Sequence, residues 1–516
     1  MSTSTTPSNL VFMRSTSTLV VASVAAAAAA SVLVPYMLWR KRSKIPLPPS
    51  PRSYPIIGNL LDMPKKQDHL GFVEIGNNLK SDMFSLNVVG TVIIVLNNAE
   101  DAINLLEKRS NIYSDRPHRS MICEPSLMNW STLVSALEYG ERWRKSRRMM
   151  HQWLHKQAVE AFYPSQQRQA RMFLQRLLSK SENLDSSEEL EREVYRALAG
   201  TIVNSVYGSG VQESPEIMTK LKQTVDNLSK AALASNFLVN IFPALVRVPD
   251  WFPWTEWKRT ARLWREQKDD AIDSPYNRTK SEMQKEGQDP SMVELMLGQA
   301  TDLGLDESEI DDYVKEVAFI LYGGGTDTTV SAILVFFVAM LLFPNVQRKA
   351  QDEIDSVIGS DRLPTMEDRP HLPYVGRLIQ EVLRWRPIFP LGLPHQCYQD
   401  DVYKGYRIPK GALIFGNIWA ISHDAEVYKD PETFDPDRFL DARVPHSPTF
   451  GFGRRLCPGI HYAGSSLFIF IASILAAFKI EPTKDEHGND VMPAPESENM
   501  VIQYVKSHMA RSNTQV

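Results

Sequence analysis

Cysteine is scarce in this sequence, and its scarcity excludes several architectures. The 516 residues include only Cys123, Cys397 and Cys457, whose spacing forms no C-x-x-C motif. A disulfide scaffold is therefore excluded, and the usage is typical of a reducing compartment. Positive charge is not in excess either: 57 lysines and arginines face 61 aspartates and glutamates, a net charge of −4. This balance gives no indication of a nucleic-acid partner.

Other features are also missing from the chain. It has no repeat of fixed period, no regular alternation of strand and helix patterns, and no Pro/Gly-rich linker inside the body. A repeat protein, a doubly wound sheet and a divided body are therefore disfavoured. Hydrophobic residues make up 43% and charged residues 23% of the chain. This composition excludes intrinsic disorder and is typical of a globular protein with a large core.

Helical periodicity dominates the body of the chain. Amphipathic spacing predicts long helices, and short β-type runs predict two hairpins. The helices are expected near 141–180, 188–207, 308–356 and 371–386, and the hairpins at 83–96, turning at Gly90, and at 402–416, turning at Pro409-Lys410-Gly411. We therefore expect a mainly α (α+β) fold with small β-sheets, forming one domain over residues 59–516.

The N-terminal region contains a long uncharged stretch. Residues 15–39 carry no charge, and 18–39 would span about 33 Å as a helix, enough for a hydrocarbon core of roughly 30 Å. A basic cluster at 40–44, against Arg14 alone on the other side, places residues 1–17 outside the cytosol. A cleaved signal peptide would carry its basic residues before the apolar core, and a transit peptide would contain more arginine. The sequence thus predicts an uncleaved transmembrane helix.

Two further segments are rich in proline or tryptophan. Residues 40–58 combine the basic cluster with several prolines between Pro46 and Pro55, which predicts a stiff, extended connector. Residues 251–257 place tryptophans in a stretch broken by proline. Such a cluster suits either the headgroup layer of a membrane or the packing of a helix corner, and both interpretations stay open.

The region around the third cysteine carries the sharpest chemical signal. The loop Phe450-Gly451-Phe452-Gly453-Arg454-Arg455-Leu456 leads into Cys457-Pro458-Gly459, and an apolar helix is expected from Ile460 to about Phe478. The positive end of a helix dipole and the two arginines both favour a thiolate. Gly453 and Gly459 allow a large flat group to come close. A single thiolate of this kind suits one axial bond to a haem iron, although an isolated cysteine is more often structural.

The loop also matches the pattern Phe-x-x-Gly-x-Arg-x-Cys-x-Gly, and in this it resembles the haem-binding loop of the cytochrome P-450 family. Other segments resemble motifs of the same family, in the same order. They are Trp143-Arg144-Lys145-Ser146-Arg147 (W-x-x-x-R), Gly324-Gly325-Thr326-Asp327-Thr328-Thr329 of a long central helix, Glu381-Val382-Leu383-Arg384 (E-x-x-R) and Pro436-Asp437-Arg438-Phe439 (P-x-R-F). The anchor and proline-rich connector resemble the microsomal members, and the overall similarity is to fungal enzymes of secondary metabolism.

The resemblance implies a haem b cofactor with Cys457 as the axial ligand of its iron. Loop residues Phe450, Gly453 and Gly459 would then lie against the haem. The implied partners of the haem propionates are Trp143, Arg147, His395 and Arg455, of which the arginines offer charge-assisted hydrogen bonds. A structural role explains His395 nearly as well.

The resemblance also implies a structural core behind the haem. Glu381 and Arg384 are spaced i, i+3, so they share a helix face on which they are able to pair. The family adds Arg438 as a third member. Without the other motifs, an ordinary surface pair would be the better explanation of the first two.

The pattern of the central helix is interrupted by glycine. Residues 313–342 are apolar, yet Gly323-Gly324-Gly325 lie in the middle, and each glycine costs a helix about 1 kcal/mol relative to alanine. Such a weak point often marks a kink or the close approach of a ligand. Asp327 and Thr328 follow, and the resemblance implies that they deliver protons when dioxygen is reduced. The alternative is a surface-facing acid beside a threonine bonded to its preceding turn.

The expected substrate and redox partner follow from position and from the resemblance. The candidate pocket residues are Met121, Ile122, Met128, Phe319, Tyr322, Ile388, Phe389 and Leu391. Their apolar and aromatic character favours a small lipophilic substrate of terpenoid, polyketide or indole type. No G-x-G-x-x-G follows a strand, so electrons must come from another protein. Basic residues within 142–148 offer a face for an NADPH–haemoprotein reductase, although a solvated helix face explains them too.

We therefore expect a monomeric haem-dependent monooxygenase that uses dioxygen to hydroxylate or epoxidise its substrate. It would be held in the endoplasmic reticulum membrane by a single span, in contact with membrane lipid, with its catalytic domain in the cytosol. One alternative keeps the fold but acts as a peroxide isomerase or dehydratase, which has no use for Asp327 and Thr328. The other is a haem- or lipid-binding membrane protein without turnover, against which the complete set of motifs argues.

Overall fold

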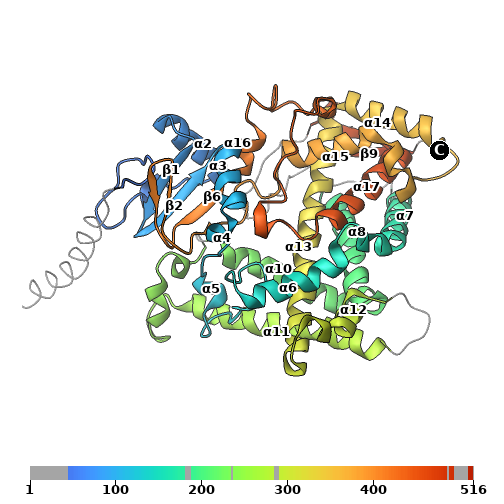
Figure 1. The fold of residues 1–516 in the computed structure, drawn as a ribbon. Helices are drawn as coiled ribbons and strands as arrows, with labels where there is room; N and C mark the ends of the chain where they lie inside the picture. Colours follow the sequence, from blue (N-terminus) through green and yellow to red (C-terminus); the bar gives the residue numbers. More distant parts are fainter. Residues whose placement is uncertain are drawn as a thin grey trace, which may run out of the picture.

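The computed structural model describes residues 45–180, 187–233, 236–283, 290–484, 487, 489–492 and 510–514. The predicted transmembrane helix at 18–39 and the basic cluster that follows it lie outside the described residues. Within them the fold is mostly helical with small β-sheets (Figure 1), so the predicted fold class is confirmed for this part of the chain.

The elements have the following bounds. The helices are α2 (Asp68–Leu79), α3 (Ala99–Ala102), α4 (Ser110–Tyr113), α5 (Ser120–Cys123), α6 (Glu141–Leu154), α7 (Tyr163–Lys180), α8 (Ser187–Tyr207), α9 (Ser209–Gln212), α10 (Pro215–Ala232), α11 (Glu256–Glu282), α12 (Met292–Gln299), α13 (Glu307–Leu342), α14 (Pro344–Val357), α15 (Pro373–Trp385), α16 (Ile418–Ser422) and α17 (Ile460–Ala477). The strands are β1 (Met83–Val88), β2 (Thr91–Leu96), β3 (His395–Gln396), β4 (Asp401–Tyr403), β5 (Tyr406–Ile408), β6 (Leu413–Gly416), β7 (Phe478–Lys484), β8 (Asp490–Val491) and β9 (Ala510–Thr514). A π-helix, η2 (Ile103–Lys108), follows α3, and the 3-10 turns include η3 (Ala158–Phe162), η8 (Pro436–Leu440) and η9 (Gly453–Arg455).

The largest sheet lies at one end of the molecule, on the left in Figure 1, with strand order β1-β2-β6-β3. Strands β1 and β2 form the first predicted hairpin, with Val88 opposite Thr91. Val89 and Gly90 of its turn both have positive φ, 51° and 88°. That geometry matches the twist of an antiparallel pair and explains why a glycine is needed there.

The second predicted hairpin is wrong. Strands β4 and β5 form the hairpin instead, turning at Lys404 and Gly405, which have positive φ of 49° and 79°. The following strand, β6, lies parallel to β2, with Ile414 opposite Ile94. One partner of β6, β2, is therefore a strand from far earlier in the chain, which a local pattern does not reveal; the other partner is β3.

Helix α13 is the central element of the helical body and runs through the middle of it in Figure 1. Its residues 329–341 are all buried. Helices α8 and α17 pack against it, and their apolar side chains share a core cluster with it. A helix that is covered on every side needs apolar residues on every side, which explains its continuous hydrophobic pattern.

One predicted long helix is divided by a proline. Residues 308–356 form α13 and α14, because Pro344 begins a new helix and Phe343 before it leaves helical geometry at φ −128° and ψ 65°. A residue that precedes proline is sterically disfavoured in the α region, whereas proline suits the first turn of a helix.

The other divided helix is the one predicted at 141–180. Helix α6 ends before His155, whose backbone is extended at φ −72° and ψ 163°, and η3 separates it from α7. The helices predicted at 188–207 and 371–386 agree with α8 and α15 to within two residues.

Two described helices, α13 and α17, are long and apolar enough to cross a membrane by composition alone. Their apolar windows are 83% and 61% buried inside the protein, respectively. Both contribute to the same core cluster, so burial by neighbouring helices accounts for their hydropathy.

The described part of the predicted connector is tied to the body. The Ser85 backbone N–H donates to Pro49 O at 2.8 Å, and the Ser85 hydroxyl donates to Pro48 O at 2.8 Å. The Arg407 N–H donates to Pro46 O at 2.7 Å. Proline has no N–H but keeps its carbonyl. The segment therefore accepts hydrogen bonds from the edge strands β1 and β5 of two sheets and is fixed against them.

Candidate functional site

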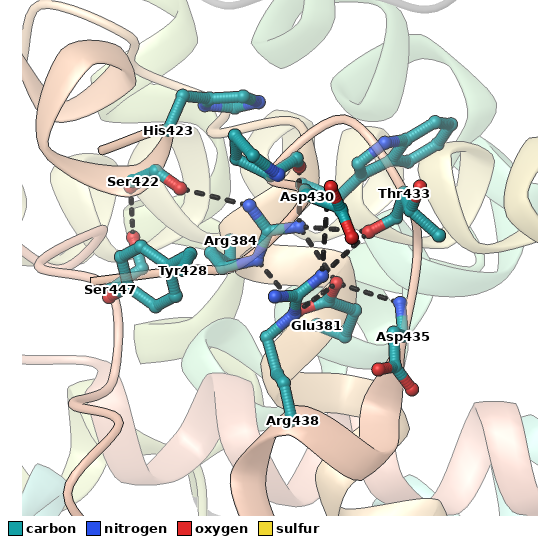
Figure 2. A network of polar contacts seen from close by, with 12 residues as sticks. Glu381, Arg384, Ser422, His423, Tyr428, Asp430, Thr433, Asp435, Arg438 and Ser447 are labelled. Carbon is teal, nitrogen blue, oxygen red and sulfur yellow. Dashed lines mark hydrogen bonds and ion pairs between the residues drawn. The ribbon is translucent and has the colours of Figure 1, made fainter. Parts of the chain in front are cut away.

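Glu381, Arg384 and Arg438 meet in a buried network, in which dashed lines mark their contacts in Figure 2. Arg384 Nε and Nη2 each donate to the Glu381 carboxylate at 2.7 Å, and Arg438 Nε donates to the same group at 3.0 Å. The side chains of Glu381 and Arg384 are 0% exposed and that of Arg438 is 6% exposed. The alternative of an ordinary surface pair is therefore wrong.

Other N–H groups of the two guanidinium groups donate hydrogen bonds to main-chain carbonyls. Arg384 donates to Ser422 O and Pro431 O, each at 2.9 Å. Arg438 donates to Lys429 O at 2.7 Å and Thr433 O at 2.9 Å. Because one carboxylate faces two cations, these carbonyl dipoles supply part of the compensation that buried charges need. The network thereby fixes α15 to the segment that leads toward the Cys457 loop.

The loop around Cys457 is closed by its own backbone. The Cys457 N–H donates to Phe450 O at 2.8 Å. Gly453 has φ 52°, and a Cβ at this position would lie 2.3 Å from Leu106 O, so only glycine fits. Gly459 is the N-cap of α17, and a Cβ there would lie 3.8 Å from Cys457 Sγ, an ordinary contact.

Opposing effects act on the pKa of the Cys457 thiol. Burial raises the pKa of Cys457, while the Gly459 N–H and the charge of Arg147 act in the opposite direction. The helix start and one arginine therefore favour the thiolate, but burial outweighs them. Coordination to a metal ion would reverse this, because a coordinating thiol loses its proton.

Arg455 and two α6 residues form one side of the site. Arg455 donates to Ser114 O at 2.8 Å and Leu137 O at 2.7 Å, and its guanidinium lies 4.5 Å from the centre of the Trp143 ring. Burial lowers the pKa of Arg455 to about 10, and repulsion from Arg147 acts in the same direction. Arg147 lies one turn after Trp143 on α6 and is half-buried. The predicted propionate partners Trp143, Arg147 and Arg455 are thus brought together.

Arg116 is a further member of this site that the sequence motifs did not indicate. It is 7% exposed and donates to Leu393 O at 2.8 Å and Pro394 O at 2.7 Å. Its Nε is buried and has no hydrogen-bond partner among the described residues. Burial lowers the pKa of Arg116, and the charges of Arg455 and Arg119 lower it further. The only sequence signal was a pair of cations, Arg116 and Arg119, in an irregular stretch.

This group of arginines fits the propionates of a haem. Asp115 is the carboxylate whose charge acts on both Arg116 and Arg455. In the described part of the chain, Asp115 forms no salt bridge with either, since its Oδ1 accepts the backbone N–H groups of Arg116 and Tyr139. An excess of buried positive charge is costly unless an anion offsets it. Together with the thiol on a closed glycine loop, the residues present therefore fit a haem.

His395 is buried and lies against the protein main chain. It is 5% exposed, and its Nδ1 lies 2.7 Å from Tyr113 O, a carbonyl that only accepts, so Nδ1 carries the proton. Burial lowers the pKa of His395 well below its usual value, and Arg116 acts in the same direction. The neutral ring is left with an Nε2 that accepts hydrogen bonds. Both predicted roles stay open, because a propionate beside Nε2 would itself favour a proton there.

Helix α13 continues without a break through the three glycines, and its surface is exposed at Gly324. Thr328 Oγ1 donates to Gly324 O at 2.8 Å. Gly324 is exposed, and a Cβ there would meet no atom within 4 Å, although most of the surrounding helix is buried. Asp327 is 5% exposed, so the alternative of a surface-facing acid is wrong, while the threonine is bonded to its preceding turn as that alternative expected.

The candidate pocket residues fall into different parts of the core. Met121, Ile122, Met128 and Phe319 share one buried cluster, Ile388 and Phe389 belong to the cluster around α13 and α17, and Leu391 packs near β1 and β2. Tyr322 lies on the face of α13 that packs against α8, since a Cβ on Gly325, one turn later, would lie 2.9 Å from Ile202. Tyr322 also belongs to the buried cluster that contains Met121 and Phe319, and its role as a substrate contact stays a prediction.

Comparisons with known proteins agree with this architecture. The model of the Cytochrome P450 family matches residues 48–506. The cytochrome P450 monooxygenase claR of Ampulloclitocybe clavipes is 38% identical over 475 residues, which cover 90% of this chain and 86% of that protein. Cytochrome P450 monooxygenase COX1 of Coprinopsis cinerea is 34% identical over 483 residues, covering 90% and 92%. A zebrafish cytochrome P450 solved with abiraterone shares the fold, with a TM-score of 0.69 and 23% identity over 87% of this chain and 100% of that chain.

The family model covers most of the chain, and the fungal relatives align along nearly their whole length. Members of this family hold a haem iron through a cysteine thiolate and use dioxygen, which agrees with the Cys457 loop and the arginines around it. The chain therefore belongs to the cytochrome P450 family and is a haem-dependent monooxygenase.

Proposed function

We propose that this protein is a membrane-anchored, monomeric monooxygenase that hydroxylates or epoxidises a neutral lipophilic compound of secondary metabolism. Its electrons come from NADPH through a separate reductase. The observation that carries the proposal is the convergence of buried arginines, with little carboxylate charge to offset them, on the loop of a single cysteine. That donor set suits a haem. The separate reductase is proposed because no G-x-G-x-x-G motif follows a strand in the sequence.

Each part of the proposed reaction is assigned to residues of this chain. Haem bound at Cys457 supplies the reduction of dioxygen and the transfer of one oxygen atom. Arg116, Arg147 and Arg455 hold the propionates through charge-assisted hydrogen bonds. Asp327 and Thr328 supply protons at the open turn of α13, where the Thr328 hydroxyl is oriented by Gly324 O.

Asp327→Asn should slow NADPH oxidation by about 10-fold or more, because an amide has no acidic proton to transfer. The full-length holoenzyme is assayed with an excess of microsomal NADPH–haemoprotein reductase and with phenanthrene as a neutral lipophilic probe. Incorporation of labelled oxygen from dioxygen into the probe is measured alongside. Glu307→Gln removes an exposed carboxylate at the start of the same helix and serves as the control.

Three results would decide against this assignment. An Asp327→Asn rate equal to that of the wild type and of the control would remove Asp327 from proton delivery. A wild-type protein that oxidises no NADPH but rearranges a lipid hydroperoxide would favour the isomerase or dehydratase. A holoprotein without either activity would favour the binding protein.

The proposed substrate class rests on a cluster of buried apolar side chains that includes Phe319 of the central helix α13. Met121, Ile122, Met128 and Phe319 are each at most 2% exposed and apolar. A pocket lined by such side chains binds neutral apolar molecules and rejects charged ones. Terpenoid, polyketide and indole skeletons, all typical of secondary metabolism, satisfy this condition.

The reductase would dock on the exposed cations near the Cys457 loop. Arg144 and Arg148 of α6 and Arg454 of the loop are all exposed. Arg142 and Lys145 are already paired, with Asp312 at 2.6 Å and Glu141 at 3.4 Å. The exposed cations are therefore the ones left to attract an acidic partner.

The tryptophan-rich segment supports a second membrane contact in addition to the proposed span at 18–39 in the endoplasmic reticulum membrane. Trp251 and Trp254 are 81% and 83% exposed, and Phe252 is 44% exposed. Lys258 fixes the segment, because its Nζ donates to Val246 O at 2.9 Å. Exposed indole rings are favourable at the headgroup layer, which argues against the helix-corner alternative for these two rings.

Quenching by brominated lipid tests this membrane contact. In the full-length protein reconstituted into bilayers, the double variant Trp251→Ala/Trp254→Ala should lose about half or more of the lipid-quenched tryptophan fluorescence. Leu440→Ala, at an apolar side chain that is 67% exposed, is the control and should change nothing. Equal quenching in the double variant and the wild type would show that the two rings stay in water.

A further inference from the structure

Two tyrosine hydroxyls are paired inside the helical body. Tyr322 of α13 is fully buried, and its hydroxyl lies 2.9 Å from the hydroxyl of Tyr195 on α8, which is half-buried. Helix α13 packs against both α8 and α10. A hydroxyl both donates and accepts, so the pair is able to pass a proton from one oxygen to the other.

Two charged side chains, Lys222 and Asp226, lie at the surface end of this pair, with Lys222 beside Tyr195. Lys222 of α10 places its Nζ 5.2 Å from the centre of the Tyr195 ring and forms a 3.3 Å ion pair with Asp226. Both side chains of that ion pair are about half exposed, at 51% and 46%. Tyr195 therefore lies between solvent and the buried Tyr322.

Asp327 follows Tyr322 by five residues on the same helix, α13. The charge of Asp327 raises the pKa of both Tyr195 and Tyr322, after burial as the main cause, so the carboxylate lies within electrostatic reach of both hydroxyls. Raised pKa values keep both tyrosines protonated near neutral pH, as a relay requires. Thr326, one turn beyond Tyr322 and next to Asp327, has a buried Oγ1 without a hydrogen-bond partner among the described residues. Buried hydroxyls normally have a partner, and an ordered water at Thr326 is the ordinary way to provide one.

We propose that Tyr195 and Tyr322 form a relay that carries protons from solvent beside the Lys222–Asp226 pair to Asp327. The inference rests on the proposed role of Asp327 in proton delivery. In each transfer, a tyrosine oxygen accepts a proton from the solvent side and releases its own proton on the inner side, so neither residue changes its charge. Both are positioning residues that act through Asp327.

A tyrosine in this part of the core does not need such a pair to be stable. Tyr207, also on α8, is fully buried, and its hydroxyl has no hydrogen-bond partner among the described residues. Its ring packs in the cluster that also contains Tyr322. Tyr207→Phe therefore removes a buried hydroxyl from the same helix without breaking a hydrogen bond to another described residue and is a matched control.

The test measures the rate of NADPH oxidation and its solvent isotope effect. Wild type, Tyr322→Phe, Tyr195→Phe and Tyr207→Phe are compared as full-length holoenzymes with reductase and phenanthrene, in water and in deuterium oxide. Tyr322→Phe and Tyr195→Phe should oxidise NADPH about threefold or more slowly and show a larger isotope effect, because proton delivery becomes limiting. Haem content should stay unchanged in every variant. The rate of the first reduction of the haem iron, measured by carbon monoxide binding, should also stay unchanged.

The outcomes separate the relay from the function on which it rests. Rates and isotope effects of Tyr322→Phe and Tyr195→Phe equal to those of Tyr207→Phe would overturn the relay alone. A loss of rate that is matched by slower first reduction or lower haem content, with no change in isotope effect, would assign the pair a structural role and overturn the relay as well. A wild-type holoenzyme that oxidises no NADPH would overturn the proposed function together with the relay.

Discussion

Glu381→Gln should abolish most of the correctly folded holoprotein. The substitution keeps the shape of the side chain but removes the charge that faces Arg384 and Arg438 at 2.7 Å and 3.0 Å. Breaking a buried ion pair by removing one partner costs about 3–5 kcal/mol, because the other charges stay buried and uncompensated. That is a large part of the roughly 5–15 kcal/mol by which a folded domain is stable.

The measurement is the yield of haem-containing protein together with the urea midpoint, followed by tryptophan fluorescence. Asp441→Asn is the matched control, since it makes the same chemical change at an ion pair with Arg443 whose side chains are 43% and 90% exposed. Solvent screens such a pair, so the control should behave like the wild type. A Glu381→Gln protein with normal yield and midpoint would show that the network is not needed for the fold.

Local pattern was sufficient for features that depend on neighbouring residues in the chain. The β1–β2 hairpin follows from two β-type runs around Gly90, and α15 and α17 follow from their hydrophobic patterns. The i, i+3 spacing of Glu381 and Arg384 indicated a shared face because both residues lie in one helix. The buried state of the pair was less accessible, since it depends on the loop near Arg438 that closes over it.

Features that depend on distant segments were missed. Strand β6 pairs with β2, and nothing near Leu413 indicates that partner. Arg116 joins the Cys457 site through the carbonyls of Leu393 and Pro394, a contact between segments far apart in the chain. The hydrogen bond between Tyr322 and Tyr195 of α8 was also missed, because the direction of a side chain on a fully buried helix depends on which neighbour packs where.

The charge of the Cys457 thiol shows a different limit. The sequence correctly indicated that the start of the helix favours the thiolate, but the arginine whose charge does so is Arg147 and not Arg454 or Arg455. Burial acts against both and is the largest cause of the raised pKa. The extent of burial depends on how the whole chain folds, so the spacing of residues in the sequence does not reveal it.

Cys457→Ser should remove the spectral signature of thiolate ligation completely. Serine has nearly the same size, but its hydroxyl is a far weaker acid than a thiol and a poor ligand for haem iron. Haem is still expected to associate in part, because the arginine contacts of its propionates remain. Cys397→Ser is the matched control: Cys397 is 0% exposed and its Sγ donates to Gln399 O, a hydrogen bond that a serine hydroxyl retains.

The most direct test of the account is the carbon monoxide difference spectrum of the dithionite-reduced protein, recorded for wild type, Cys457→Ser and Cys397→Ser. The account predicts a strongly red-shifted Soret band of the thiolate type in the wild type and in Cys397→Ser, and no such band in Cys457→Ser. A band typical of histidine-ligated haem in the wild type, or an unchanged thiolate band in Cys457→Ser, would contradict the assignment of Cys457 as the ligand.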